Sequence, residues 1–214
     1  TRKRSSAASD VYKRQEYDWN GIPLVISRTG WSSELGYEVF LRDGSKGGEL
    51  WDYLMAVGEP MGLKPGHTSS IRRIEGAMLS YHADMTLKNN PFELGMDRLV
   101  DLDMDADFVS KAALKRIKEE GISQLQVGLE FDGDPLEGSN DELWPISIDG
   151  DVVGRVTSAI YSPRLEKNIA LALIAIDHSA IGTRATIHTE EGERQCEVVP
   201  KPFHDPKKAI AATG

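Results

Sequence analysis

The second half of the chain carries short apolar stretches that are separated by turns. These stretches are residues 127–131, 145–148, 152–157, 169–176, 185–188 and 194–199. The pairs Asp132-Gly133, Asp149-Gly150 and Glu191-Gly192 supply turn-forming residues between them. Short strands at this spacing are typical of an antiparallel barrel or sandwich. We therefore predict a small antiparallel β-barrel over residues 123–208, followed by a tail over 209–214.

The first half mixes strand and helix patterns. Apolar residues alternate over 22–26 and 37–41, which predicts two strands, and they recur at helical spacing over 50–57, which predicts an amphipathic helix. A second helix is expected over 69–78, capped by Ser69 or Ser70, and a third over 108–118, closed by Gly121. Residues 93–102 look like a strand. Together these elements indicate an α+β fold with a ββα unit.

Between the first two predicted strands, residues 28–38 read Arg-Thr-Gly-Trp-Ser-Ser-Glu-Leu-Gly-Tyr-Glu. Gly30 and Gly36 can take the backbone conformations that a sharp reversal needs, so Trp31 and Glu34 would be presented together at the tip of a hairpin-like loop. An acid beside an indole suits a flat heterocycle that donates hydrogen bonds. A solvated glutamate and a packed aromatic are the alternatives.

Two further motifs follow this block. Arg-Ile-Glu at 73–75 precedes Tyr81, and Gly-Arg-Val-Thr-Ser at 154–158 continues into Ser-Pro-Arg-Leu at 162–165 and Ile-Ala-Leu-Ala at 169–172. The three motifs in this order resemble the folate-dependent aminomethyltransferase family, which includes the glycine cleavage T-protein. Trp-Ser-Ser at 31–33, with segments 89–95 and 203–208, looks most like the dimethylsulfoniopropionate demethylase branch of that family.

The resemblance implies the C-terminal part of the family's folate-binding domain, with ferredoxin-like ββα elements over 16–122, followed by the barrel. Full-length members carry a long upstream portion that includes much of the folate cavity and the catalytic aspartate. The chain is therefore expected to be a C-terminal fragment without an assigned catalytic residue. Residues 1–15, with five basic side chains and one acidic, are expected to be a non-native or disordered tail. A basic tail or a transit segment is the alternative.

The resemblance also implies a binding site for tetrahydrofolate. Glu34 would accept two parallel hydrogen bonds from the amino-pyrimidine edge of the folate. Arg73 would meet the polar edge or acidic tail of the folate, or orient an acidic neighbour, and Tyr81 would wall the pocket or pack in the core. Trp31 would contact the substrate, because an aromatic face attracts a methylated cation.

The residues beside these candidates have structural interpretations. Arg72 must face away from Arg73 on a helix and is expected to form a surface salt bridge. Glu75 would be its partner or lie on the helix surface. Glu38, on the strand that follows the loop, is expected to be structural.

The resemblance implies methyl transfer from a small sulfonium acid to N5 of tetrahydrofolate, giving 5-methyltetrahydrofolate. The partner would be a small-molecule methyl donor. Aminomethyl transfer from a lipoyl-bound intermediate is the nearest alternative. A non-catalytic folate-binding protein of the same fold is another, but such proteins carry a cysteine motif that this chain lacks. The fragment by itself is expected to be inactive.

Composition excludes other classes of function. The formal charge of −9 argues against a nucleic-acid partner. The single cysteine, Cys196, cannot form an internal disulfide, which suits an inert thiol in the reducing cytoplasm. The apolar run over 169–176 is far shorter than the roughly 20 residues of a membrane-spanning helix. Scattered histidines give no metal-binding pattern.

Overall fold

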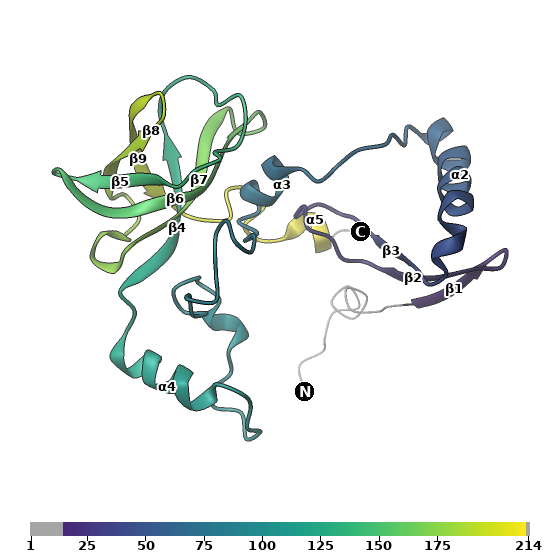
Figure 1. The fold of residues 1–214 in the computed structure, drawn as a ribbon, viewed down its shortest axis with the longest axis horizontal. Helices are drawn as coiled ribbons and strands as arrows, with labels where there is room; N and C mark the ends of the chain where they lie inside the picture. The colour runs from purple at the N-terminus through teal and green to yellow at the C-terminus, as the bar shows by residue number, and fades with distance from the viewer. Residues whose placement is uncertain (1–14, 213–214) are drawn as a thin grey trace. The chain divides into compact units, whose positions relative to one another are not determined.

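The structure is a computed structural model that describes residues 15–212 (Figure 1). The chain divides into two compact units, which are residues 1–72 with 207–214, and residues 73–206. Apart from Gln15, the predicted tail over 1–15 lies outside the described residues. The predicted tail after residue 208 contains a short helix, α5 (Ala209–Ala212).

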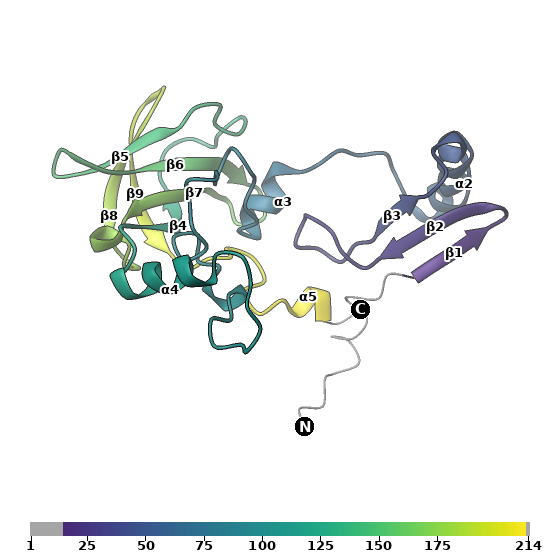
Figure 2. The same cartoon turned by 60° about the horizontal axis from the view of Figure 1, so that its bottom comes forward.

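The first unit contains a three-stranded antiparallel sheet with one long helix on one face. The strands are β1 (Gln15–Trp19), β2 (Ile22–Ser27) and β3 (Glu38–Leu41), in that order, and the helix is α2 (Gly47–Gly58) (Figure 2). Ile22, Leu24 and Leu50 form the buried centre between sheet and helix. The predicted ββα unit is confirmed. Strand β1 was not predicted, because its sequence Gln-Glu-Tyr-Asp-Trp is mostly polar.

Short 3-10 helices flank α2. They are η1 (Gly44–Lys46) and η2 (Glu59–Met61), and Asp43 caps the first by accepting a hydrogen bond from the backbone N–H of Ser45. Gly62 ends the second with a φ of +92°, a conformation that glycine adopts without strain.

Helix α3 (Ser70–Glu75) is shorter than the helix predicted over 69–78. The Ser69 hydroxyl accepts a hydrogen bond from the backbone N–H of Arg72 at 3.4 Å, as expected of an N-cap. The helix cannot continue to residue 78 because Ala77 has a φ of +52°.

The strand predicted over 93–102 is wrong. Those residues form turns and the 3-10 helix η3 (Asp97–Leu99). The side chain of Asn90 accepts hydrogen bonds from the backbone N–H groups of Phe92 and Glu93, at 3.0 and 3.1 Å. Such a turn uses backbone donors that a strand ladder would need. The helix predicted over 108–118 is confirmed as α4 (Lys111–Glu120), and Gly121 closes it with a φ of +85°.

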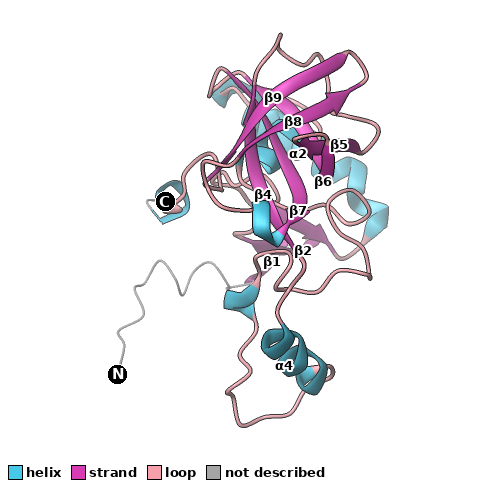
Figure 3. Cartoon of the chain, turned by 90° about the vertical axis from the view of Figure 1, so that its left-hand side faces the viewer, coloured by secondary structure: helices cyan, strands magenta, loops and turns pink. Residues whose placement is uncertain are grey.

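The second unit contains a closed antiparallel barrel, as predicted. Its strands are β4 (Gln124–Phe131), β5 (Trp144–Ile148), β6 (Asp151–Ser162), β7 (Lys167–Ala175), β8 (Arg184–Thr189) and β9 (Gly192–Val199). They close in the order β4-β7-β6-β5-β8-β9, and the 3-10 helix η4 (Ile176–His178) follows β7 (Figures 1 and 3). The α+β fold class is therefore confirmed.

Strand β7 is buried on both of its faces. Ala170, Ala172 and Ile174 belong to the core inside the barrel. The alternate residues Ile169 and Leu171 face the other way, yet they are fully buried. Further chain in this unit therefore covers the outer face of the barrel. An apolar run over both faces is typical of a strand that is covered on each side.

The segment after β9 is part of that outer cover. A Cβ atom at Gly128 of β4 would lie 3.0 Å from Cζ of Phe203 and 3.3 Å from Cβ of Lys201. Glycine at this position lets the segment pass close over β4. In the described part of the chain, no helix has both the length and the apolar character needed to cross a bilayer.

Candidate functional site

Residues 28–37 form the loop that joins β2 to β3. The two strands pair antiparallel, with Ser27 opposite Glu38, so Trp31 and Glu34 are carried by one hairpin loop as predicted. The predicted role of Gly30 and Gly36 is wrong, since neither has a positive φ. Ser33 takes the left-handed conformation in their place, with a φ of +57°. In a loop of this length the change in chain direction is distributed over several residues, so no glycine with a positive φ is needed.

Both candidate side chains of this loop are accessible. Oε1 of Glu34 lies 3.6 Å from Nη1 of Arg72, and the glutamate side chain is 30% exposed. Trp31 is 44% exposed. The surface salt bridge predicted for Arg72 is confirmed, with Glu34 as a partner. The loop therefore carries a carboxylate held beside an arginine and an indole that solvent reaches.

Glu38 has a local contact at the base of the same loop. The Thr29 hydroxyl donates a hydrogen bond to Oε2 of Glu38 and lies 3.1 Å from the Ser27 hydroxyl. This contact joins the two ends of the loop across the strand pair, as expected for a structural residue.

In the second unit, Arg73 is buried in a polar network centred on Asp84. The Asp84 side chain is fully buried and its Oδ2 accepts hydrogen bonds from Nη1 of Arg73 at 2.9 Å and from the Ser80 backbone N–H at 2.8 Å. Its Oδ1 accepts from the hydroxyls of Thr157 and Ser158, at 2.6 and 2.7 Å. Nη2 of Arg73 also donates to the Ser158 hydroxyl at 2.9 Å.

This network fixes α3 and the turn after it to strand β6. Charge-assisted hydrogen bonds of this kind are stronger than neutral ones, and each partner leaves a buried charge if the other is removed. Arg73 thus contacts an acidic neighbour, which is one of the two roles expected for it. Its contact with folate stays a prediction.

Glu75 anchors the same helix at a second point. It is 1% exposed, accepts a hydrogen bond from the Ser162 hydroxyl at 2.6 Å, and lies 3.7 Å from Nη1 of Arg164. The expectation that Glu75 lies on the helix surface is wrong, because this end of α3 faces β6 and not solvent. The backbone carbonyl of Glu75 also accepts a hydrogen bond from the His204 N–H at 3.1 Å.

Two of the sequence motifs therefore meet in space. Arg73 and Glu75 of the first motif contact the hydroxyls of Ser158 and Ser162 directly, and Asp84 links Arg73 to the hydroxyl of Thr157. The sequence does not predict Asp84 as the hub of this network, and it predicts Thr157 and Ser158 only as part of the start of the barrel. The available signal was that pair itself, since two adjacent hydroxyls in a long apolar strand place one of them on a buried face.

Tyr81 lies in the turn after α3. It is 48% exposed, its ring centroid is 4.2 Å from that of His82, and it forms an isolated parallel bridge with Met85. Its role in walling a pocket stays a prediction. Trp31 and Glu34 share one loop of the first unit, whereas Arg73 and Tyr81 belong to the second unit.

Two further titratable groups have shifted pKa values. Burial raises the pKa of the Cys196 thiol to about 11, in agreement with an inert thiol. Burial lowers the pKa of Lys201 to about 8, although the charge of Asp84 opposes that shift. Nζ of Lys201 donates a hydrogen bond to Oε1 of Gln126. Within residues 15–212, no three potential metal ligands are grouped around one position.

Comparison with protein families gives two matches along this chain. The GCVT N-terminal domain matches residues 2–104, and the glycine cleavage T-protein C-terminal barrel domain matches residues 125–205. The second match coincides with the barrel described above. The chain belongs to the glycine cleavage T-protein family.

Curated relatives of this chain are named for two different enzyme activities. The aminomethyltransferase of Symbiobacterium thermophilum is 36% identical over 191 residues, which are 86% of this chain and 49% of that protein. The dimethylsulfoniopropionate demethylase DmdA of Ruegeria pomeroyi is 33% identical over 189 residues, which are 87% of this chain and 50% of that protein. The chain thus spans about half the length of the curated relatives it matches.

A solved structure has the same fold. The crystal structure of glycine cleavage system aminomethyltransferase T from Bartonella henselae matches with a TM-score of 0.71 at 18% identity, over 84% of this chain and 49% of that one. This likeness supports the fold of the T-protein family and does not distinguish between the named activities.

Proposed function

We propose that the protein takes part in tetrahydrofolate-dependent one-carbon transfer, and that the donor is a small sulfonium acid such as dimethylsulfoniopropionate. The observation that carries the proposal is the loop over 28–37, where the accessible carboxylate of Glu34 and the accessible indole of Trp31 lie on one hairpin. Family membership makes folate the natural ligand for this pair.

The residue types of the loop fit a reduced folate. The amino-pyrimidine edge of a pterin presents parallel N–H donors, and a carboxylate such as that of Glu34 accepts two of them. Arg72 lies 3.6 Å from Glu34 and would hold the carboxylate in place. When bound, tetrahydrofolate would supply the N5 amine that accepts the one-carbon group.

The remaining task of the protein would be to position the donor. A sulfonium group leaves as a neutral thioether, so the step needs little acid or base help. Holding the reactants in line in a water-excluded pocket can supply effective molarities of ~10⁵ M or more. Trp31 offers a large aromatic face, which attracts a methylated cation by about 0.5 to 2 kcal/mol.

The partners proposed are thus a folate and a small-molecule methyl donor. A reducing compartment such as the cytoplasm suits the buried thiol of Cys196.

A competition experiment tests the proposal. The chain, expressed with whatever coding sequence precedes it in its gene, is incubated with tetrahydrofolate and an equal mixture of dimethylsulfoniopropionate, dimethylglycine and an aminomethyl-lipoyl carrier. We expect 5-methyltetrahydrofolate as the main product. If 5,10-methylenetetrahydrofolate dominates, the demethylase assignment is wrong and aminomethyl transfer, the activity named for the Symbiobacterium thermophilum relative, replaces it. The chain of 214 residues alone is expected to form neither product at an enzymatic rate.

Folate binding is tested separately with Glu34→Gln. The amide presents one donor where the carboxylate presents an acceptor, so binding of tetrahydrofolate should weaken by ~1 to 3 kcal/mol. Glu49→Gln, on the exposed side of α2, is the matched control and should leave the dissociation constant unchanged. Equal affinity of the Glu34 variant and the parent in a fluorescence titration would return Glu34 to the role of a solvated loop residue.

A further inference from the structure

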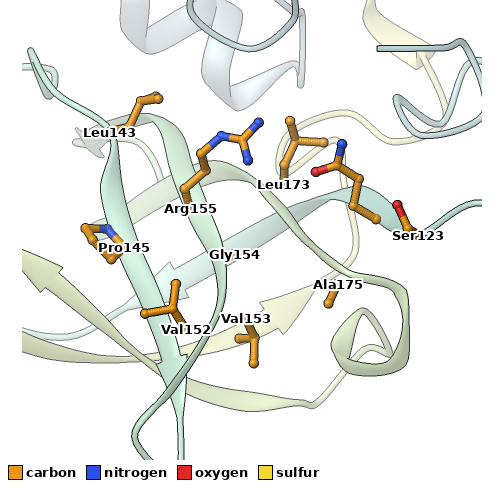
Figure 4. A pocket seen from close by; sticks show the side chains of 10 residues that line it. Ser123, Leu143, Pro145, Val152, Val153, Gly154, Arg155, Leu173 and Ala175 are labelled. Carbon is orange, nitrogen blue, oxygen red and sulfur yellow. The ribbon is translucent and has the colours of Figure 1, made fainter. Parts of the chain in front are cut away.

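The barrel has a groove on its outer surface. None of the roles that the sequence motifs predict for folate binding places folate in this groove. It has a volume of about 520 Å³ and lies between the start of β4, the β5 and β6 pair, and the end of β7. Its apolar walls include Leu143, Pro145, Val152 and Leu173 (Figure 4). This volume lies within the range of roughly 300 to 1,000 Å³ that small-molecule sites occupy.

The groove contains one cation and no acid. Arg155 is the charged residue among the ten that line it, and Figure 4 shows its side chain pointing away from the ribbon of β6 toward the Leu173 side. Within residues 15–212, the Arg155 side chain has no hydrogen bond or ion pair. In the same unit, the buried arginines Arg73 and Arg194 are paired with Asp84 and Glu191. Arg98 and Arg116, which like Arg155 have no side-chain partner within the described residues, are exposed to solvent.

A half-buried arginine without a partner is unexpected in this chain. Acidic residues outnumber basic ones by 34 to 25, so a carboxylate partner is easily supplied. Arg155 is half-buried, and a half-buried cation among apolar walls lacks part of its hydration. Leu143 and Val152, by contrast, are 52% and 72% exposed, so the walls expose apolar surface to water. A ligand with an anionic group next to an apolar body would pair with the Arg155 cation and cover the exposed apolar walls.

We propose that this groove binds a small monocarboxylate with an apolar body. The guanidinium of Arg155 presents a planar fork that matches a carboxylate in a bidentate manner. Leu143, Pro145 and Val152 would cover the apolar body. A dianion such as a phosphate monoester is a poorer match, because one cation among apolar walls leaves its second charge uncompensated.

Binding to the whole chain tests this proposal directly. Octanoate combines both features, acetate has the carboxylate without the body, and octanol has the body without the charge. In calorimetric titrations we expect octanoate to bind with a dissociation constant of about 1 mM, and acetate and octanol to bind at least tenfold more weakly. Equal affinity for octanol and octanoate, or no octanoate binding up to about 10 mM, would overturn the proposal.

Substitutions locate the site. Arg155→Gln should weaken octanoate binding at least tenfold. Val152→Asp places a negative charge in the wall, which repels the carboxylate of octanoate, and should weaken binding several-fold. Arg184→Gln is the matched control, because Arg184 is an exposed arginine of the same barrel that pairs with Glu197. Within the described residues, Arg155 has no ion pair and Val152 is 72% exposed, so both variants should keep the parent's melting temperature. An equal loss in the Arg155 and Arg184 variants would show non-specific attraction to a basic surface and would refute the site.

Discussion

Replacement of Asp84 by asparagine tests how much the buried network contributes to the second unit. Asp84 is fully buried and accepts four hydrogen bonds, from Arg73, the Ser80 backbone, Thr157 and Ser158. Asparagine keeps the shape of the side chain. It removes the negative charge and turns one acceptor into a donor that faces other donors.

The expected cost follows from the loss of one partner of a buried ion pair. Such a loss costs about 3 to 5 kcal/mol, because the remaining charge stays buried without compensation. The hydroxyls of Thr157 and Ser158 can rotate and accept from the new amide, so we expect the lower end, about 3 kcal/mol. With an m-value of about 2 kcal/mol per molar urea, the unfolding midpoint of the unit should fall by about 1.5 M.

Fluorescence of Trp144 reports on this transition, since Trp144 is buried in the barrel core. The assay uses a parent in which Trp19, Trp31 and Trp51 are phenylalanine, so that emission comes from the barrel alone. Glu130→Gln is the control, because it breaks the exposed pair with Lys167 and should cost less than about 1 kcal/mol. A cost below about 1 kcal/mol for Asp84→Asn would refute the view that the network is a principal anchor of α3.

Three further outcomes are expected. Burial lowers the pKa of Lys201 from 10.5 to about 8, so its charged form destabilises the folded state at low pH. The free energy of unfolding should therefore rise as the pH increases from about 8 to 10.5. Urea titrations should show this rise in the parent and not in Lys201→Met. Cys196 should react with a thiol reagent far more slowly at pH 8 in the folded chain than in urea, since its pKa is about 11; equal rates would contradict its burial. Gly154→Ala should lower the free energy of unfolding by more than about 2 kcal/mol, because the new Cβ would lie 2.4 Å from the Leu173 carbonyl oxygen. Gly138→Ala, which has open space around it, should change that free energy by less than about 0.5 kcal/mol in the same assay.

Local periodicity was sufficient to predict most of the strands and helices. The barrel strands were predicted because alternating apolar residues and turn pairs such as Asp149-Gly150 act over a few residues. The early end of α3 and the turns over 93–102 were not predicted. In the turn that begins the second segment, the Asn90 side chain competes for the backbone donors of Phe92 and Glu93, and the periodicity of apolar residues does not reveal that competition.

The sequence by itself predicted the family motifs, the barrel strands and the loop that carries Trp31 with Glu34, because each motif, strand and loop consists of residues that lie close together in the chain. Only the tertiary structure showed that Asp84 joins Arg73 to Thr157 and Ser158. Thr157 and Ser158 lie more than 70 positions after Asp84, and hydrogen bonds between distant residues leave no periodic pattern in a single sequence. Only the tertiary structure likewise showed that Arg155 has no ion pair within the described residues, because whether a charge has a partner depends on which residues the fold places around it.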